Sequence, residues 1–317
     1  MDFYSFYSIG NPHFLVDEAL ALKHNNHRFI TGQRKTIALV FLNPSLRTRM
    51  STQEAAQRMG MEVICFNSTD AWSWEMEDGA VMNGNKTEHI KDAARVISQY
   101  ADIIGIRCFA NFENREDDSN DKVIKQFIKY ATVPVVNMES AALHPLQSLA
   151  DMITLEEYKP GRKLKIALTW APHPKALPHA VANSFAQWSI GMGHDVHICH
   201  PPGFELDPRY TNGGIITHDQ ISAFQDADII YAKSWSSSIH YGQSTDKHQD
   251  WIIDQKKMSF TNDAGFMHCL PVRRNVVVTD EVLDGPQSLI IPQAKNRLYS
   301  AQIVIKRILE RMEAVEV

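Results

Sequence analysis

Residues 45–48, which read Ser-Leu-Arg-Thr, place two hydroxyl groups and a guanidinium between an apolar run and a helix-forming run. The apolar run, residues 36–41, is rich in β-branched side chains and predicts a buried strand. The residues after it favour a helix that ends at Gly60. A helix N-terminus offers unpaired amides and the positive end of the helix dipole, so these groups together suit an oxyanion such as phosphate. An ordinary helix cap with a solvated arginine explains the segment equally well when it is taken alone.

Two further polar residues stand where they could meet an oxyanion. Arg107 lies near the end of an apolar strand predicted over residues 102–109, and a buried arginine needs an acceptor. A bound carbonyl or phosphate oxygen could supply that acceptor, and so could the acidic loop at residues 113–118. His144 begins a helix predicted over residues 144–158, and Pro145 suits its first turn. A surface histidine that caps this helix is the alternative.

A segment far along the chain gives these residues a common context. Residues 265–271 read Gly-Phe-Met-His-Cys-Leu-Pro, and two arginines follow. Together with Ser-Leu-Arg-Thr-Arg at residues 45–49, this pattern resembles the aspartate/ornithine transcarbamylase family. His-Pro-Leu-Gln at residues 144–147 and Arg107 match the same family, and the matches run in order from residue 45 to Arg297. Four motifs in register are strong evidence, whereas one short motif could be chance.

The resemblance implies a carbamoyl phosphate site. In that site Arg107, His144 and Arg297 would be catalytic, because they would polarise the carbonyl group and stabilise the tetrahedral oxyanion. Trp72 would come from a loop of the neighbouring chain in a homotrimer with shared active sites, although a tryptophan there could also serve only for packing. The implied contacts to carbamoyl phosphate are Ser45, Leu46, Arg47, Thr48, Trp72, Arg107, His144, Gln147, Cys269, Leu270 and Arg297.

The stretch Tyr-Ala-Lys-Ser-Trp at residues 231–235 departs from ornithine transcarbamylases. The resemblance implies that those enzymes hold a free α-ammonium group with an aspartate and a Ser-Met-Gly loop. Lys233 has the wrong charge for an ammonium ion and the right one for the oxygens of an acylated amino group. Residues 169–175 and 270–275 also look like the N-acyl-ornithine branches of the family. The residues implied for the acylated substrate are Thr87, Glu139, His173, Lys233 and Arg273.

Two positions bear on the acyl group. In the acetyl branch of the family a lysine stands at the position of Val277 and a glutamate at that of Thr87, where the succinyl branch has proline. Thr87 matches neither branch, but it would not repel a succinyl carboxylate and could donate a hydrogen bond to it. The sequence therefore favours N2-succinyl-L-ornithine as the carbamoyl acceptor, in a step toward arginine. N-acetylornithine is the first alternative, and a catalytically silent transcarbamylase-like binding protein is the second.

Composition excludes several other classes of protein. The chain has 317 residues, 44% of them hydrophobic, and a formal net charge of −5, so a nucleic-acid partner has no electrostatic support. No apolar stretch approaches the roughly 18 to 20 residues that span a bilayer, and no secretion signal is visible. The four cysteines show no C-x-x-C pairing, and the absence of G-x-x-x-x-G-K-[ST] excludes a P-loop kinase. We expect a soluble cytoplasmic enzyme.

Three histidines, His194, His197 and His200, form a candidate metal set. Residues three apart on a strand point to opposite faces, so these imidazoles cannot easily converge on one ion. Histidines exposed at the surface explain them better. We expect neither a metal nor a cofactor.

Strands and helices alternate along the chain in two series, which predicts parallel sheets with helices on both faces. We therefore expect an α/β fold of two doubly wound parallel-sheet domains joined by helices, with the active site in the cleft between the domains. The expected parts are a carbamoyl phosphate-binding domain at residues 1–148, an amino-acid substrate domain at residues 149–296, and a helix at residues 297–317 packing back on the first domain. Residues 67–87 are expected to form an ordered functional loop, and residues 288–291 a final strand.

Overall fold

A computed structural model of the chain describes residues 2–8, 10–25, 31–67 and 73–316. The chain forms two compact units, unit 1 (Met1–Leu146 with Arg297–Val317) and unit 2 (Gln147–Asn296). The two boundaries fall inside the helices α6 (Pro145–Tyr158) and α12 (Ile290–Glu316), so continuous helices join the units. Both units are built on parallel sheets, which confirms the predicted α/β class.

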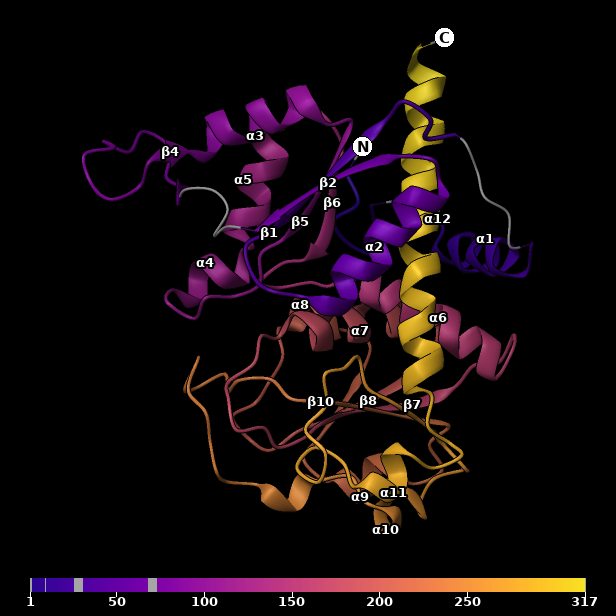
Figure 1. The fold of residues 1–317 in the computed structure, drawn as a ribbon. Helices are drawn as coiled ribbons and strands as arrows, with labels where there is room; N and C mark the ends of the chain where they lie inside the picture. The colour runs from indigo at the N-terminus through magenta and orange to yellow at the C-terminus, as the bar shows by residue number, and fades with distance from the viewer. Residues whose placement is uncertain (1, 9, 26–30, 68–72, 317) are drawn as a thin grey trace. The chain divides into compact units, whose positions relative to one another are not determined.

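Unit 1 contains a four-stranded parallel sheet in the order β2-β1-β5-β6. The helices α3 and α5 lie side by side against it (Figure 1). The register pairs Phe41 with Arg107 and Arg107 with Glu139, so the carboxyl ends of β1, β5 and β6 lie at one edge. The elements of unit 1 before α6 are α1 (Pro12–Asn25), β1 (Thr36–Phe41), α2 (Leu46–Arg58), β2 (Glu62–Asn67), β3 (Trp74–Glu75), β4 (Glu88–His89), α3 (Ile90–Tyr100), β5 (Ile103–Arg107), α4 (Arg115–Ser119), α5 (Lys122–Tyr130) and β6 (Val135–Glu139).

Unit 2 contains a five-stranded parallel sheet in the order β11-β10-β7-β8-β9. The helix α7 has most of its residues buried, as expected of a helix that covers a sheet. The elements of unit 2 between α6 and α12 are β7 (Lys165–Trp170), α7 (Ala180–Gly191), β8 (Asp195–Cys199), α8 (Pro208–Thr211), β9 (Ile215–Thr217), α9 (Gln220–Phe224), β10 (Ile229–Lys233), a 3₁₀ turn (Gln249–Trp251), α10 (Gln255–Met258), β11 (Gly265–Met267) and α11 (Asp280–Leu283).

Each unit has its own apolar core. In unit 1, Ile104 and Ile106 of β5 pack with Ile124 and Phe127 of α5, and all four are fully buried. In unit 2, the rings of Phe185 and Tyr231 stack with their centroids 3.8 Å apart. Burial of one such large apolar side chain contributes about 1.5–3 kcal/mol. These cores hold the strand ends that carry the candidate site residues.

The prediction of a strand at residues 288–291 is wrong. Ser288 makes only an isolated bridge to Phe266, and α12 begins two residues later, at Ile290. The apolar run Leu-Ile-Ile suggested a strand, but Pro292 suits the first turn of a helix and helix-forming residues follow it. The long helix α12 therefore starts before the predicted residue 297.

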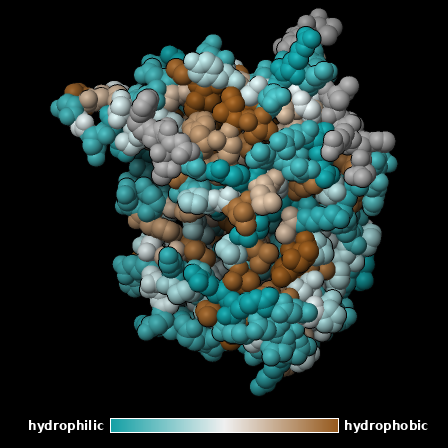
Figure 2. Space-filling model, in the orientation of Figure 1, coloured by the Kyte–Doolittle hydropathy of each residue, from teal (hydrophilic) through white to brown (hydrophobic). Residues whose placement is uncertain are grey.

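The surface of the molecule mixes hydrophilic residues with hydrophobic patches, as Figure 2 shows for one face. Leu46 and Met50, one turn apart on α2, are large apolar residues that are exposed in the single chain. Val81, between β3 and β4, is also exposed. No helix in the described part of the chain is both long and apolar enough to cross a membrane.

Candidate active site

The amino end of α2 forms where the sequence predicted an anion site. Ser45 is the N-cap of this helix, and its Oγ accepts a hydrogen bond of 3.2 Å from the backbone N–H of Thr48. Leu46 is exposed and Arg47 is half-buried, whereas Thr48 is buried. The helix cap is confirmed, and the anion site stays a prediction that is compatible with it, because the cap fixes the first turn that an anion would meet.

Two arginines contact the buried hydroxyl of Thr48. Nη2 of Arg297 donates a hydrogen bond to Thr48 Oγ1 at 2.5 Å, and Nη1 of Arg107 lies 3.5 Å from the same oxygen, at the limit of hydrogen bonding. The three residues come from α12, β5 and α2, and all belong to unit 1. A hydroxyl that accepts from guanidinium groups can still donate its own proton. This arrangement suits a phosphate or carbonyl oxygen.

Arg107 pairs with Glu139 rather than with the acidic loop at residues 113–118. Nη1 of Arg107 forms an ion pair with Oε2 of Glu139, and both side chains are 11% exposed. Nε2 of His144 lies 3.6 Å from the same carboxylate oxygen, and His144 is buried. The alternative of a surface histidine at the start of α6 is therefore wrong. Glu139 also does not act only as a helix cap, since its carboxylate faces two candidate catalytic residues.

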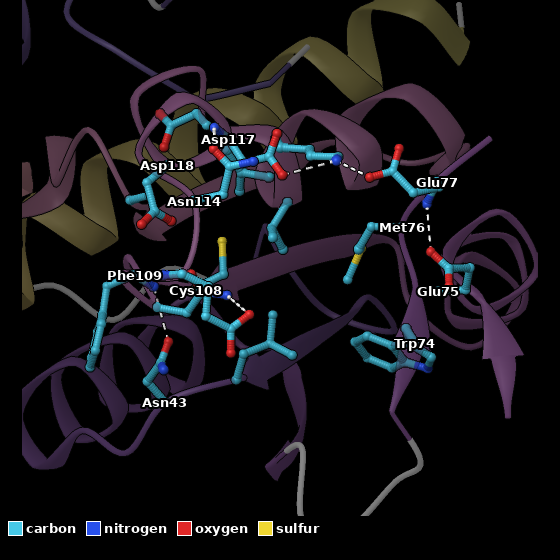
Figure 3. Close-up of a pocket in the computed structure, with 18 of the residues that line it drawn as sticks. Asn43, Trp74, Glu75, Met76, Glu77, Cys108, Phe109, Asn114, Asp117 and Asp118 are labelled. Carbon is cyan, nitrogen blue, oxygen red and sulfur yellow. Dashed lines mark hydrogen bonds and ion pairs between the residues drawn. The ribbon is translucent and has the colours of Figure 1, made fainter. Parts of the chain in front are cut away.

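Phe109 is a member of this group that sequence reasoning missed. The guanidinium carbon of Arg107 lies 5.2 Å from the centroid of the Phe109 ring, within range of a cation–π interaction. The backbone N–H of Phe109 donates a hydrogen bond of 2.9 Å to Asn43 Oδ1, which ties the ends of β5 and β1 together (Figure 3). The sequence signal that could have identified Phe109 is its position two residues beyond Arg107, just after the end of the strand.

A cavity of about 400 Å³ lies beside this group in unit 1. Asn43, Cys108 and Phe109 form part of its wall, and Trp74 of β3 and Met76 directly after β3 face it (Figure 3). Neither Thr48 nor Arg297 lines it, so the cavity adjoins the arginine group without containing it. Burial raises the pKa of the Cys108 thiol well above its ordinary value, so this cysteine stays protonated and is not a nucleophile.

The loop between β3 and β4 is held at its base by α5. Gln126 Nε2 donates a hydrogen bond of 2.8 Å to the Met76 carbonyl, Lys122 pairs with Glu77, and Lys129 pairs with Asp78. From this base the loop extends away from the rest of unit 1 (Figure 1). Thr87 is exposed near its end, and its N–H donates to the Ser73 carbonyl at 3.2 Å. Trp72 lies outside the described residues.

In unit 2, Gln147 is part of a buried polar network around Asp151. Gln147 Nε2 and Gln293 Nε2 each donate a hydrogen bond of 2.8 Å to Asp151 Oδ1, and Tyr231 OH donates to Oδ2 at 3.1 Å. The side-chain oxygen of Gln293, Oε1, accepts a hydrogen bond of 3.0 Å from the backbone N–H of His268. Sequence reasoning missed Asp151 and Gln293. The spacing of four residues between Gln147 and Asp151 on one helix was the available signal.

The segment after β11 is fixed by its own histidine. The backbone N–H of Leu270 donates to His268 Nδ1 at 2.9 Å, and His268 is buried while Cys269 and Leu270 are partly exposed. The peptide between Leu270 and Pro271 is cis, and Leu270 has a φ of +54°. Residues 269 and 270 are thus partly open to solvent, and the hydrogen bond to His268 fixes the backbone of Leu270.

Two predicted substrate-binding residues of unit 2, Lys233 and Arg273, lie within electrostatic range of a third, His173. Burial lowers the pKa of His173, and the positive charges of Lys233 and Arg273 lower it further. Lys233 is buried at the end of β10, whereas Arg273 is exposed. The imidazole is therefore neutral at pH 7, beside two cations that could hold carboxylate oxygens. Val277 is 1% exposed, so its side chain packs in the core of unit 2 and does not line a site.

The described residues contain no group of three or more His, Cys, Asp or Glu side chains placed to hold a metal ion. Of the histidines considered in the sequence, His200 is buried and its Nδ1 bonds the Pro201 carbonyl, while His197 lies 3.6 Å from Asp195. The reading of all three as surface residues is thus wrong for His200.

Comparison with known proteins covers almost the whole chain. Residues 7–157 match the family model for the aspartate/ornithine carbamoyltransferase carbamoyl-P binding domain, and residues 177–308 match that for the Asp/Orn binding domain. The N-succinylornithine carbamoyltransferase of Bacteroides fragilis (strain 638R) is 47% identical over 308 residues, which are 96% of this chain and 97% of that protein. The N-acetylornithine carbamoyltransferase of Xanthomonas axonopodis pv. citri (strain 306) is 41% identical over 293 residues, 86% of this chain and 85% of that one.

Solved structures give the same picture. A crystal structure of a glutamate-to-alanine mutant of N-acetyl-L-ornithine transcarbamylase, complexed with carbamyl phosphate and N-succinyl-L-norvaline, matches with a TM-score of 0.91 at 39% identity. The match covers 96% of this chain and 98% of that one.

Proposed function

The chain belongs to the aspartate/ornithine carbamoyltransferase family, and we propose that it transfers the carbamoyl group of carbamoyl phosphate to the δ-amine of N2-succinyl-L-ornithine. The products are N2-succinyl-L-citrulline and phosphate, and the step belongs to arginine biosynthesis. The observation that carries this proposal is the buried Thr48 hydroxyl held by Arg297 and Arg107, with Glu139 and His144 beside them.

In the proposed reaction the phosphate group binds at the amino end of α2. Ser45, Leu46, Arg47 and Thr48 supply amides, hydroxyls and a guanidinium, which match the oxygens of a phosphate dianion. Trp72 of a neighbouring chain completes this part of the site in a homotrimer. Arg107, His144 and Arg297 stabilise the negative charge that develops on the carbonyl oxygen as the amine attacks.

The carbamoyl NH2 group is held by acceptors. Gln147 Oε1 is a buried oxygen that has no hydrogen-bond partner among the described residues, and Nε2 of the same side chain is held by Asp151. An amide oxygen fixed in this way accepts a hydrogen bond from the carbamoyl NH2 without reorganising. The backbone at Cys269 and Leu270 supplies further acceptors.

The acylated amino acid is held mainly by cations. Lys233, Arg273 and neutral His173 suit its two carboxylates, and Glu139 suits its amine. The δ-amine has a pKa of about 10 in water, so the site must favour its neutral form. When the neutral amine attacks, its nitrogen becomes positively charged, and the departing phosphate accepts the proton that this nitrogen then loses.

Succinyl rather than acetyl is supported by Thr87 and by relatives. The resemblance assigns a glutamate to this position in the acetyl branch, and a glutamate near a succinyl carboxylate would repel it. The crystal structure with N-succinyl-L-norvaline is that of a mutant in which a glutamate has been replaced. The relatives that are 47% and 46% identical are named for succinylornithine, whereas those named for acetylornithine are between 39% and 42% identical.

A side-by-side assay tests the proposal. The protein is incubated with carbamoyl phosphate and, in turn, ornithine, N-acetylornithine and N-succinylornithine, and kcat/KM is measured from citrulline and phosphate formation. We expect the succinyl substrate to be preferred. Preference for the acetyl substrate would establish the runner-up function, and no turnover with any acceptor would favour a silent binding protein.

A further inference from the structure

Glu139 pairs with the guanidinium of Arg107, which the proposed reaction requires for binding its substrate. Its Oε2 pairs with Nη1 of Arg107, and the two residues stand opposite each other in the register of β5 and β6. The register shifts between Ile106 and Arg107, which is where an irregular strand can redirect a side chain. The pairing is thus fixed by the sheet edge rather than by a flexible loop.

Other charged and polar side chains of unit 1 lie close to this pair. Arg297 and Arg107 converge on Thr48, His144 lies 3.6 Å from Glu139, and Glu139 is the carboxylate that pairs with Arg107. A phosphate dianion that reaches Thr48 would meet both guanidiniums, which attract its negative charge.

A substrate oxygen and the Glu139 carboxylate compete for the same donor. Nη1 of Arg107 is the atom that contacts both Glu139 and Thr48, and its side chain is only 11% exposed. A guanidinium nitrogen of this kind carries two N–H groups, and those of Nη1 face Glu139 and Thr48. A substrate oxygen that binds Nη1 therefore exchanges with one of these acceptors.

From this geometry we propose that Glu139 is a positioning residue that holds Arg107 in the ligand-free protein, is displaced by carbamoyl phosphate, and is thereby released for the amine of the second substrate. The last step rests on the proposed function. Because coupling between two ligands is reciprocal, the acylated amino acid should in turn tighten carbamoyl phosphate.

The test is calorimetric titration of the full-length chain with carbamoyl phosphate alone and with inorganic phosphate alone. Glu139→Gln removes the charge and keeps the shape of the side chain. Glu113→Gln is the matched control, because it removes one negative charge from an exposed loop residue bonded to Asn111. Glu139→Asp keeps the charge on a shorter side chain, and it serves as the second variant if Glu139→Gln fails to melt cooperatively.

We expect Glu139→Gln to bind both anions about fivefold more tightly or better, at the lower end of ordinary coupling between ligands. Glu139→Asp should tighten binding less, and Glu113→Gln should match wild type. At saturating carbamoyl phosphate, the KM for N-succinylornithine should rise in Glu139→Gln. Unchanged or weaker anion binding in Glu139→Gln would overturn the exchange, because it would mean that Glu139 only braces Arg107.

These titrations need no turnover, so they separate the two proposals. Tighter anion binding without carbamoylation of any acceptor would leave the exchange at Arg107 standing and remove the proposed function. Turnover in wild type together with unchanged anion binding in Glu139→Gln would leave the proposed function standing and remove the exchange at Arg107.

Discussion

The hydroxyl of Thr48 offers the sharpest test of the anion site. Thr48→Val removes this oxygen from a buried residue and leaves a side chain of nearly the same shape. The variant loses the acceptor of the 2.5 Å hydrogen bond from Arg297 and the 3.5 Å contact from Arg107. It also loses the proton that Thr48 would donate to a phosphate oxygen.

The magnitude follows from the Arg297 hydrogen bond alone. A hydrogen bond to a charged group contributes about 1.5–3 kcal/mol, which corresponds to roughly 10- to 150-fold in kcat/KM. The contact to Arg107 is not counted, because 3.5 Å is at the limit of hydrogen bonding. We therefore expect kcat/KM for carbamoyl phosphate to fall by about 10- to 150-fold in Thr48→Val.

The assay is initial-rate phosphate release at saturating N-succinylornithine, with carbamoyl phosphate varied. Thr48→Ser is the control, since it keeps the hydroxyl and loses only a methyl group. Thermal melts of both variants show whether the fold is kept. Equal kcat/KM in Thr48→Val and Thr48→Ser would refute the role given to this hydroxyl.

Three further outcomes are expected. Arg47→Ala should weaken carbamoyl phosphate binding and largely abolish turnover, because a charge-assisted phosphate contact is lost; unchanged affinity by calorimetry would contradict this. Mixing inactive Trp72→Ala and Arg107→Ala subunits should restore roughly a quarter of the activity at equal ratio, since each mixed cyclic trimer regains one intact shared site; no recovery after verified exchange would exclude sharing. Thr87→Glu should shift the ratio of kcat/KM from N-succinylornithine toward N-acetylornithine by about fivefold or more, because a carboxylate near the succinyl group costs about 1 kcal/mol in a wet site and more in a dry one; an unmoved ratio would show that Thr87 does not contact the acyl group.

Much of this molecule could be predicted from local sequence. The alternation of apolar runs with helix-forming runs predicts the parallel strands, because side chains buried on both faces of a strand must be apolar. The Ser-Leu-Arg-Thr segment predicts a helix N-terminus, because serine is a preferred helix cap. The structure confirms this, since the Ser45 side chain accepts a hydrogen bond from the backbone N–H three residues further on. The prediction of a strand at residues 288–291 was wrong because it also relied on local sequence. Three apolar residues in a row do not distinguish a strand from the first turn of a helix.

Contacts between distant segments were decided only by the tertiary structure. Arg297 and Thr48 are 249 residues apart, and no local pattern predicts that one guanidinium reaches one hydroxyl. Glu139 faces Arg107 because β6 lies beside β5, whereas the sequence alone offered the acidic loop at residues 113–118 as the protein partner of Arg107. The type of each polar residue and its place at a strand or helix end follow from the sequence, because they depend on neighbours in the chain. The partner of each depends on which strand ends the fold brings to one edge of a sheet.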